Sequence, residues 1–421
     1  MLDRKTEPAF KPLKKVSIPE VHKESLSNGT SLTYLNHKST SVFKIELVIK
    51  AGSWYASDYH LVPLTLKMLN EGTLQKSGKE VAEAFDKLGS FIEFVPGFDN
   101  SSLVIYGLSK YLEQNLETLS EILFEPAFEL NTFSNLKDRE AQKLELNLEK
   151  SSYKASTIQR ANLFGNKHPY GVIASPGKLR NSSLVAVKEF YNTRFKDFDI
   201  LISGNLPTNS HSLLDKFFGH HVLPEFPRVN QSFKLLNGEN RIEERNSKFV
   251  QSSIRVGRTL FNRSHSDYID FMVLNEVLGG YFGSRLMKNI REEKGFTYGI
   301  YSQLCALNHK GFYTLATDVN SDNESETISE ILLEIEKLRT ESISTEELNT
   351  VKNYMAGTFA GSLGTPFSLM DKYKAVHYQG LGLTFYDQYL DSVNSISPDR
   401  LQSLANQYLQ EQDLSLAVVG R

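Results

Sequence analysis

Residues 117–123 read ETLSEIL and residues 326–332 read ETISEIL, so seven residues return 209 positions later with one change. Both stretches have the apolar spacing of an amphipathic helix. A near-identical segment at a fixed distance is the signature of an internal repeat. The chain is therefore predicted to contain two copies of one folding unit.

Strand candidates recur at the same distance. Residues 45–49 correspond to 254–258, residues 91–94 to 300–303, and residues 102–106 to 311–315. Each half also ends on a strand candidate, residues 200–204 in the first half and 414–420 in the second. Strands and helices occur in separate runs. This order favours an α+β fold with two homologous domains, each a mainly antiparallel sheet packed with helices.

Composition suggests where the two halves meet. A polar stretch with Pro224, Pro227 and Gly238 separates them, and it runs into the charged residues 239–245, which are expected to face solvent. We therefore predict an N-terminal domain over residues 1–223, a linker over 224–248 and a C-terminal domain over 249–421. A chain of 421 residues is long enough for two separate cores.

The composition also argues against several classes of function. The formal net charge of −3 and the pI of 6.4 leave no basic excess that would favour nucleic acid or an anionic membrane surface. No apolar run approaches the ~18 residues of a membrane helix, and the first residues lack an apolar signal core. These features predict a cytoplasmic location. The single cysteine, Cys305, cannot form an internal disulfide or a thiolate metal cage.

A family resemblance rests on the order of these segments. A strand, then Ala51-Gly52-Ser53, then a helix, in a unit that occurs twice, resembles the pitrilysin/insulinase family of zinc metallopeptidases, to which the mitochondrial processing peptidase is similar. The resemblance implies the inverted zinc motif H-x-x-E-H on the first helix. Two histidines of this motif bind Zn²⁺, its glutamate acts as base on the bound water, and a downstream glutamate is the third ligand.

The corresponding helix of this chain has lost the motif. Residues 60–73 read HLVPLTLKMLNEGT, and alignment on the family's M-x-x-x-G-T, which starts at Met68, places Pro63 and Lys67 at the ligand positions and Leu66 at the base. Proline and leucine offer no lone pair, and a protonated lysine repels a dication. The resemblance therefore implies an inactive subunit with no catalytic residue, no metal and no cofactor of its own.

No other cluster is expected to replace the lost ligands. The ten histidines include no pair four residues apart on an expected helix. Glu140 and Glu145 lie near the expected third-ligand position, and without histidines beside them they are predicted to be exposed helix charges.

The second half keeps more of the family pattern. Residues 291–298, REEKGFTY, resemble the signature R-E-K-x-G-x-x-Y, whose arginine and tyrosine face the zinc site of the other half and hold the substrate in this family. The resemblance thus implies substrate binding by Arg291 and Tyr298. A structural alternative is that Arg291 stabilises a helix end, Gly295 follows that end, and Tyr298 begins a strand.

Taken with the lost motif, the resemblance implies a non-catalytic, substrate-binding subunit of a heterodimeric zinc metallopeptidase that acts on oligopeptides. Zinc is expected in a homologous partner subunit, and the isolated chain could form a homodimer. Neither nucleic acid nor a membrane is an expected partner. The alternatives are a structural scaffold subunit without peptide binding and a peptidase with unusual ligands.

Overall fold

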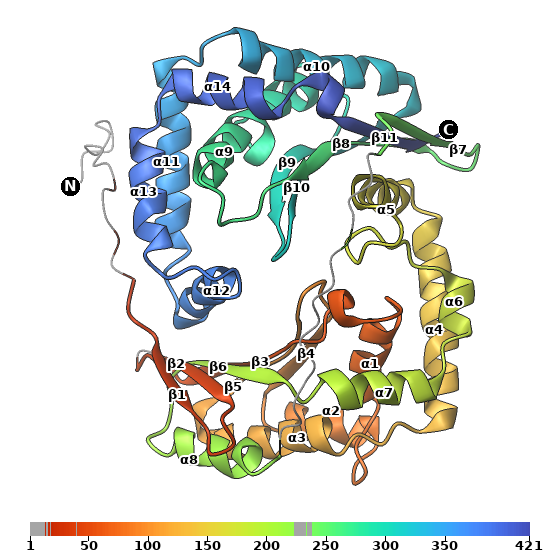
Figure 1. The fold of residues 1–421 in the computed structure, drawn as a ribbon, viewed down its shortest axis with the longest axis vertical. Coiled ribbons are helices and arrows are strands. Elements are labelled where there is room, and N and C mark those ends of the chain that lie inside the picture. The colour runs from red at the N-terminus through yellow and green to blue at the C-terminus, as the bar shows by residue number, and fades with distance from the viewer. Residues whose placement is uncertain (1–12, 14–15, 17, 39, 223–232, 234–237) are drawn as a thin grey trace, which may run out of the picture.

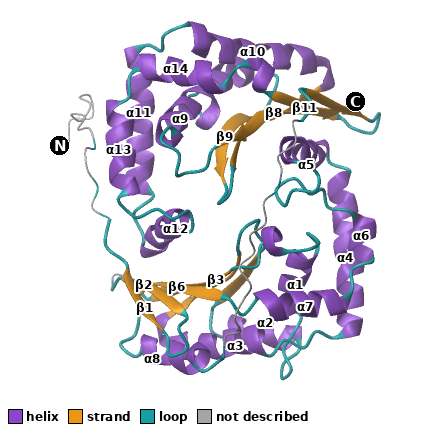
Figure 2. Cartoon of the chain, viewed as in Figure 1, coloured by secondary structure: helices purple, strands orange, loops and turns teal. Residues whose placement is uncertain are grey.

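The computed structural model describes residues 13, 16, 18–38, 40–222, 233 and 238–421. Its strands form two separate sheets, and helices cover both of them (Figures 1 and 2). Each sheet contains one parallel pair of strands, and its other neighbouring strands run antiparallel. The predicted α+β class, with two similar units built on mainly antiparallel sheets, is confirmed.

The first sheet has six strands in the order β1-β2-β6-β3-β5-β4. Their bounds are β1 His22–Ser25, β2 Ser31–Asn36, β3 Val42–Ile49, β4 Phe91–Val95, β5 Ser101–Leu108 and β6 Phe198–Gly204. The helices of this half are α1 Leu61–Asn70, α2 Gly78–Asp86, α3 Leu112–Phe124, α4 Leu130–Leu148, α5 Ser151–Phe164, α6 Pro176–Arg180, α7 Leu184–Arg194 and α8 Ser210–Leu214. All of these helices except α5 surround one apolar core on the sheet's helical side.

The second sheet has five strands in the order β7-β11-β8-β10-β9. Their bounds are β7 Arg241–Arg245, β8 Gln251–Leu260, β9 Ile300–Ala306, β10 Gly311–Asn320 and β11 Ser415–Gly420. The helices are α9 Tyr268–Asn275, α10 Glu324–Thr340, α11 Thr345–Gly361, α12 Pro366–His377, α13 Phe385–Ser395 and α14 Pro398–Tyr408. Two π-helical turns lie among them, η4 at Glu276–Gly280 directly after α9 and η5 at Met287–Glu293.

Strands β3, β4 and β5 of the first sheet correspond to β8, β9 and β10 of the second at close to the distance seen in the sequence, while β1 has no counterpart among the described residues. β4 begins at Phe91 and β9 at Ile300, which are 209 residues apart. By the same offset β7 is the counterpart of β2, although its residues fall in the stretch predicted as linker. Charged residues fill β7 because it is an edge strand, where charges oppose sheet-to-sheet pairing. Most of the predicted linker, residues 224–232 and 234–237, lies outside the described residues.

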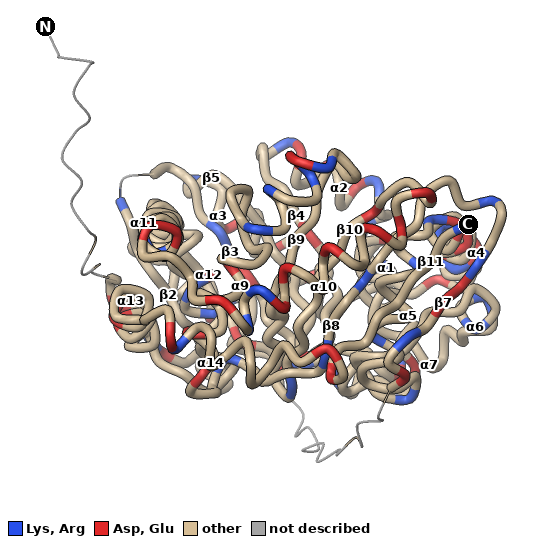
Figure 3. Tube along the Cα trace, turned by 90° about the horizontal axis from the view of Figure 1, so that it is seen from above, with Lys and Arg blue, Asp and Glu red and all other residues tan. Residues whose placement is uncertain are grey.

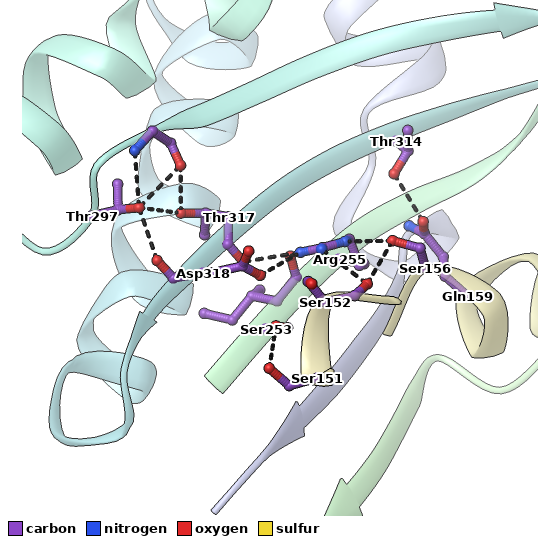
Figure 4. A network of polar contacts seen from close by, with 12 residues as sticks. Ser151, Ser152, Ser156, Gln159, Ser253, Arg255, Thr297, Thr314, Thr317 and Asp318 are labelled. Atoms are coloured by element: carbon purple, nitrogen blue, oxygen red, sulfur yellow. Dashed lines mark hydrogen bonds and ion pairs between the residues drawn. The ribbon is translucent and has the colours of Figure 1, made fainter. Parts of the chain in front are cut away.

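Helix α5 belongs to the first half in sequence but packs on the second sheet, against β8 and β11. Figure 4 shows the polar contacts that hold it there. The guanidinium of Arg255, on β8, is 5% exposed and donates to Ser156 Oγ at 3.1 Å and to the Ser152 carbonyl at 3.2 Å. Thr314 of β10 donates to Gln159 Oε1 at 2.8 Å.

Helix α12 crosses between the halves in the opposite direction. It follows α11 in the second half and packs on β6 and β2 of the first sheet. Thr365 caps its start, and Pro366 fits its first turn, where no backbone N–H is needed. Apolar contacts join Leu369, Met370 and Tyr373 to Leu35, Val48 and Leu201. Two ion pairs cross the same contact, Lys44 with Asp371 at 2.5 Å and Lys374 with Glu46 at 2.7 Å. Each half therefore covers part of the other half's sheet.

The two equivalent loops of the repeat also meet. Asn308, in the β9–β10 loop, donates its N–H to Asp99 Oδ2, in the β4–β5 loop, at 3.0 Å, and the two residues are 209 positions apart. The Trp54 ring stacks on His309 with centroids 3.6 Å apart. This contact closes the junction between the halves at the centre of the molecule.

Charge is spread evenly over the chain. In Figure 3 basic and acidic positions alternate along the trace, and neither sign dominates one region of the view. Within the described residues no helix is long and apolar enough to cross a bilayer.

Candidate functional site

Helix α1 carries the positions where the family binds zinc. An apolar stripe of α1, formed by Leu61, Leu64, Met68 and Leu69, is buried in the core of the first half. This burial fixes the rotation of the helix and directs Lys67 toward α4.

The former ligand positions form a different kind of contact. Lys67 Nζ donates to Glu140 Oε1 of α4 at 2.8 Å, and the two side chains are 37% and 16% exposed. Leu66 is 1% exposed within the apolar core, and Pro63 is half-buried. The ammonium of Lys67 thus takes the place that a metal cation would occupy beside Glu140. Glu140 was predicted to be an exposed charge. That prediction is wrong, because Glu140 is partly buried between α1 and α4, where it pairs with Lys67.

Glu145, one turn further along α4, does lie at the surface, where it forms a bidentate ion pair with Arg180 at 2.7 and 2.9 Å. His60, at the start of α1, uses both ring nitrogens locally. Its Nδ1 lies 2.7 Å from Asp58 Oδ1, and its Nε2 accepts the Ser175 N–H at 3.1 Å. Neither residue is available as a substitute ligand.

These residues do not fit zinc. A catalytic zinc site needs three protein donors of nitrogen, sulfur or oxygen, whereas this cleft offers one carboxylate that is already paired with a lysine. Across the described part of the chain, no three His, Cys, Asp or Glu side chains are grouped so that they could hold a metal ion.

Arg291 lies in the π-helical turn η5, which Gly295 follows with a φ of +65°. Its guanidinium lies 4.5 Å from the ring centroid of Phe282, which is itself 62% exposed. Arg291 forms no ion pair or hydrogen bond with any described residue. A guanidinium that rests on an aromatic face keeps its N–H donors available.

Tyr298 is 96% exposed, which is unusual for a large aromatic side chain. The residues beside it are held firmly (Figure 4): Thr297 Oγ1 donates to the Asp318 carbonyl at 2.9 Å and accepts the Gly299 N–H at 3.1 Å. Because Thr297 and Gly299 are tied to β10, the Tyr298 ring projects outward from a fixed turn. It borders a hollow of about 220 Å³ with Tyr301, Arg255 and Asp318.

The two motif residues are near in sequence but do not touch. Among the described residues, Arg291 makes neither a hydrogen bond nor a cation–π contact with Tyr298, and it does not line the hollow beside that tyrosine. Both side chains nevertheless leave their donors unused.

Two models of one protein family match this chain. Residues 32–164 match the family model "Insulinase (Peptidase family M16)", and residues 183–355 match "Peptidase M16 inactive domain". The chain belongs to the M16 peptidase family. It is a member of the inactive type, because proline and lysine stand at its zinc-ligand positions and leucine stands at the position of the base.

Relatives and solved structures agree with this placement in M16. "Uncharacterized zinc protease YmxG" of Bacillus subtilis is 24% identical over 84% of this chain and 86% of its own. "Non-peptidase homolog YmxG" of Helicobacter pylori is 22% identical over 86% and 84%. A solved M16 inactive domain from Pseudomonas fluorescens shares the fold with a TM-score of 0.84 at 21% identity, over 96% of this chain and 98% of that one.

Sequence reasoning missed two features of this M16 chain. One is the pairing of Lys67 with Glu140, although a lysine at a ligand position and a carboxylate at the third-ligand position were both visible. The other is Arg255, whose guanidinium is buried between the halves. An arginine directly between the apolar residues Ile254 and Val256 of a strand was the signal for it.

Proposed function

We propose that this M16 chain is the substrate-holding subunit of a heterodimeric zinc peptidase in the cytoplasm, and that it offers Arg291 and Tyr298 to a peptide in the partner's active-site chamber. The observation that carries the proposal is the state of these two side chains. Tyr298 is 96% exposed, and Arg291 has no acidic partner among the described residues.

The chemistry of the pair suits a peptide. The guanidinium can donate two parallel hydrogen bonds to a carboxylate or to backbone carbonyls, and the phenol adds a third donor at low entropic cost. Such contacts recognise backbone and terminal groups rather than a particular side chain. Oligopeptides of varied sequence are therefore the proposed substrates.

The partner would be a homologous subunit that keeps the zinc motif, because the cleft between α1 and α4 here cannot bind the metal. The relative named a non-peptidase homolog supports an inactive role for chains of this type. A scaffold role without peptide binding is the second candidate. A peptidase with unusual ligands is disfavoured by the Lys67–Glu140 ion pair.

The experiment is to reconstitute the pair from this chain and a homologous zinc-bearing subunit and to measure peptide hydrolysis. Arg291→Ala or Tyr298→Phe in this chain should lower kcat/KM by about 10- to 100-fold, since each lost charge-assisted bond is worth roughly 1.5–3 kcal/mol. Subunit association should persist.

Lys288→Ala is the matched control, because Lys288 is an exposed cation in the same turn as Arg291 and should leave hydrolysis unchanged. If neither Arg291→Ala nor Tyr298→Phe alters turnover while the complex still forms, the scaffold role is correct and the substrate-holding role is not.

A further inference from the structure

A cavity of about 310 Å³ lies in the second half between α9, α11, α12 and α13, away from Arg291 and Tyr298. Figure 1 shows α9 beside α11 and α13, with α12 beyond their lower ends. The cavity is lined by several aromatic side chains, among them Tyr268, Phe359, Phe385, Tyr386 and Tyr389. The volume is within the range of small-molecule sites, which are typically ~300–1,000 Å³ and apolar with a few polar groups.

Three charged side chains line this cavity, and none of them has an oppositely charged partner among the described residues. Glu276 makes no hydrogen bond or ion pair with any described residue, and its Oε2 is buried. Arg263 and Lys372 form no ion pair within the described residues, and Arg263 Nε is buried without an acceptor. All three side chains are half-buried, and burying a polar atom without a hydrogen-bond partner, as for Glu276 Oε2 and Arg263 Nε, is costly. A ligand that carries both a carboxylate and an ammonium would supply the missing counter-charges.

The positive charges lie together and apart from the negative one. Arg263 stacks on Tyr268 and Phe385 at 5.4 and 5.8 Å, while Lys372 lies over Phe359 and Tyr386 at 5.6 and 5.9 Å. Their mutual repulsion contributes to lowering the pKa of Lys372, after the larger effect of burial. Burial alone raises the pKa of Glu276, so neither cation lies close enough to stabilise its charged form.

The internal repeat adds an independent argument. Glu276 lies 209 positions after Lys67, so the two residues hold the same place on equivalent helices. In the first half Lys67 meets an acidic partner on α4. In the second half Glu276 faces α11, the counterpart of α4, where Tyr354 and Met355 line the cavity and offer no cation. In the first half an internal ion pair joins the two helices, whereas in the second half the equivalent position lines an open cavity.

We propose that this cavity binds a small zwitterion, a short peptide with free ends or an amino acid, with its carboxylate at Arg263 and Lys372 and its ammonium at Glu276. The aromatic walls would contact the apolar body of the ligand. Neither Arg291 nor Tyr298 lines this cavity, so the proposed zwitterion site does not depend on the proposed peptidase role.

The test is isothermal titration calorimetry of the full chain with three probes near neutral pH. The probes are the dipeptide glycyl-phenylalanine, its N-acetyl form, which lacks the ammonium, and its C-terminal amide, which lacks the carboxylate. We expect the free dipeptide to bind and each blocked form to bind about 10-fold or more weakly, the usual effect of losing a charge-assisted contact.

Variants assign the two ends. Glu276→Gln should weaken binding of the free dipeptide about 10-fold and leave the affinity for its N-acetyl form unchanged. Lys372→Met should likewise weaken binding of the free dipeptide and leave the affinity for its C-terminal amide unchanged. Glu346→Gln is the matched control, an exposed glutamate of α11 outside the cavity. Absence of dipeptide binding at millimolar concentration, or binding that ignores both the blocked ends and the variants, would overturn the proposal.

Discussion

At the scale of single residues, this chain shows what happens to a metal site when its ligands are lost. Glu140 lies near the position expected for the third ligand, and the ammonium of Lys67 donates to it at 2.8 Å. Without Lys67, the half-buried Glu140 carboxylate would have no counter-charge, which is costly. The lysine thus makes the cleft stable without zinc.

The retained carboxylate leads to a prediction about metal binding. The wild-type chain should contain no stoichiometric zinc after purification. The double variant Pro63→His/Lys67→His would place two imidazoles one helical turn apart beside Glu140 and should bind about one zinc ion per chain. Elemental analysis before and after treatment with a chelator measures this.

Adding Glu140→Gln to the double variant should weaken zinc binding markedly, because the third ligand is then lost. Equimolar zinc in the wild-type chain would contradict the inactive assignment.

Glu276 gives a prediction about pH. Burial raises the pKa of its carboxyl to about 7 from the ordinary value of 4.5. The folded state therefore holds this proton between about pH 4.5 and 7 while the unfolded state releases it, so the group's contribution to stability falls as pH rises through that range. Glu276→Gln should leave stability nearly unchanged near pH 4.5 and raise it above pH 7, by at most about 3 kcal/mol.

Urea unfolding of both proteins across this pH range measures the difference. A stability gap that does not change with pH would show that the Glu276 carboxyl titrates normally. Glu346→Gln again serves as the control, and its free energy of unfolding should differ little from that of the wild type at every pH.

At the scale of elements, the sequence did not predict where two helices pack, namely α5 and α12, which cross between the halves. α12 is held by apolar and ionic contacts, whereas α5 combines apolar contacts of Ala155 and Phe164 with polar contacts from Ser152, Ser156 and Gln159 to Arg255 and Thr314. Polar residues on the packed face of a helix weaken its apolar stripe, so the periodicity of α5 does not reveal where it packs. The strands were easier to predict because their β-branched residues mark them directly.

Arg255 is the element-scale prediction. Its guanidinium donates to Ser156 Oγ and to the carbonyls of Ser152, Ile254 and Thr317, and it pairs with Asp318 at 3.2 Å. Arg255→Met should lower the free energy of unfolding by about 2–4 kcal/mol, because buried acceptors on α5 and β8 lose their donor.

Chemical denaturation measures this loss. Arg139→Met, which removes an exposed arginine with one ion pair to Glu71, should change stability by less than about 1 kcal/mol. Equal effects of the two variants would mean that the buried network contributes little to holding α5.

At the scale of the whole molecule, the sequence predicted the family, the duplication and the loss of the zinc motif, because each of them can be recognised from short continuous segments of the chain. The proposed boundaries, 1–223 and 249–421, remain predictions. The contacts between halves were not predictable, since Lys44 with Asp371 and Asp99 with Asn308 join residues hundreds of positions apart. Such pairs are ordinary surface charges until the fold brings them together.

The exchange of α5 and α12 leads to a prediction about how the halves depend on each other. If residues 1–222 and 238–421 are made as two chains in one cell, they should associate and purify together, because each fragment carries a helix that covers the other's sheet. The C-terminal fragment alone lacks α5, so Arg255 and the face of β8 and β11 lose their cover, and this fragment should be aggregation-prone or partly unfolded. For the same reason, the intact chain should unfold in one cooperative transition. Lys44→Met and Lys374→Met together remove both ion pairs at α12, so this double change should weaken the association of the two fragments. Size-exclusion chromatography of the co-expressed fragments and calorimetry of the intact chain measure these outcomes. Two independently folded, monomeric fragments with separate melting transitions would show that the exchanged helices add little to the stability of either half.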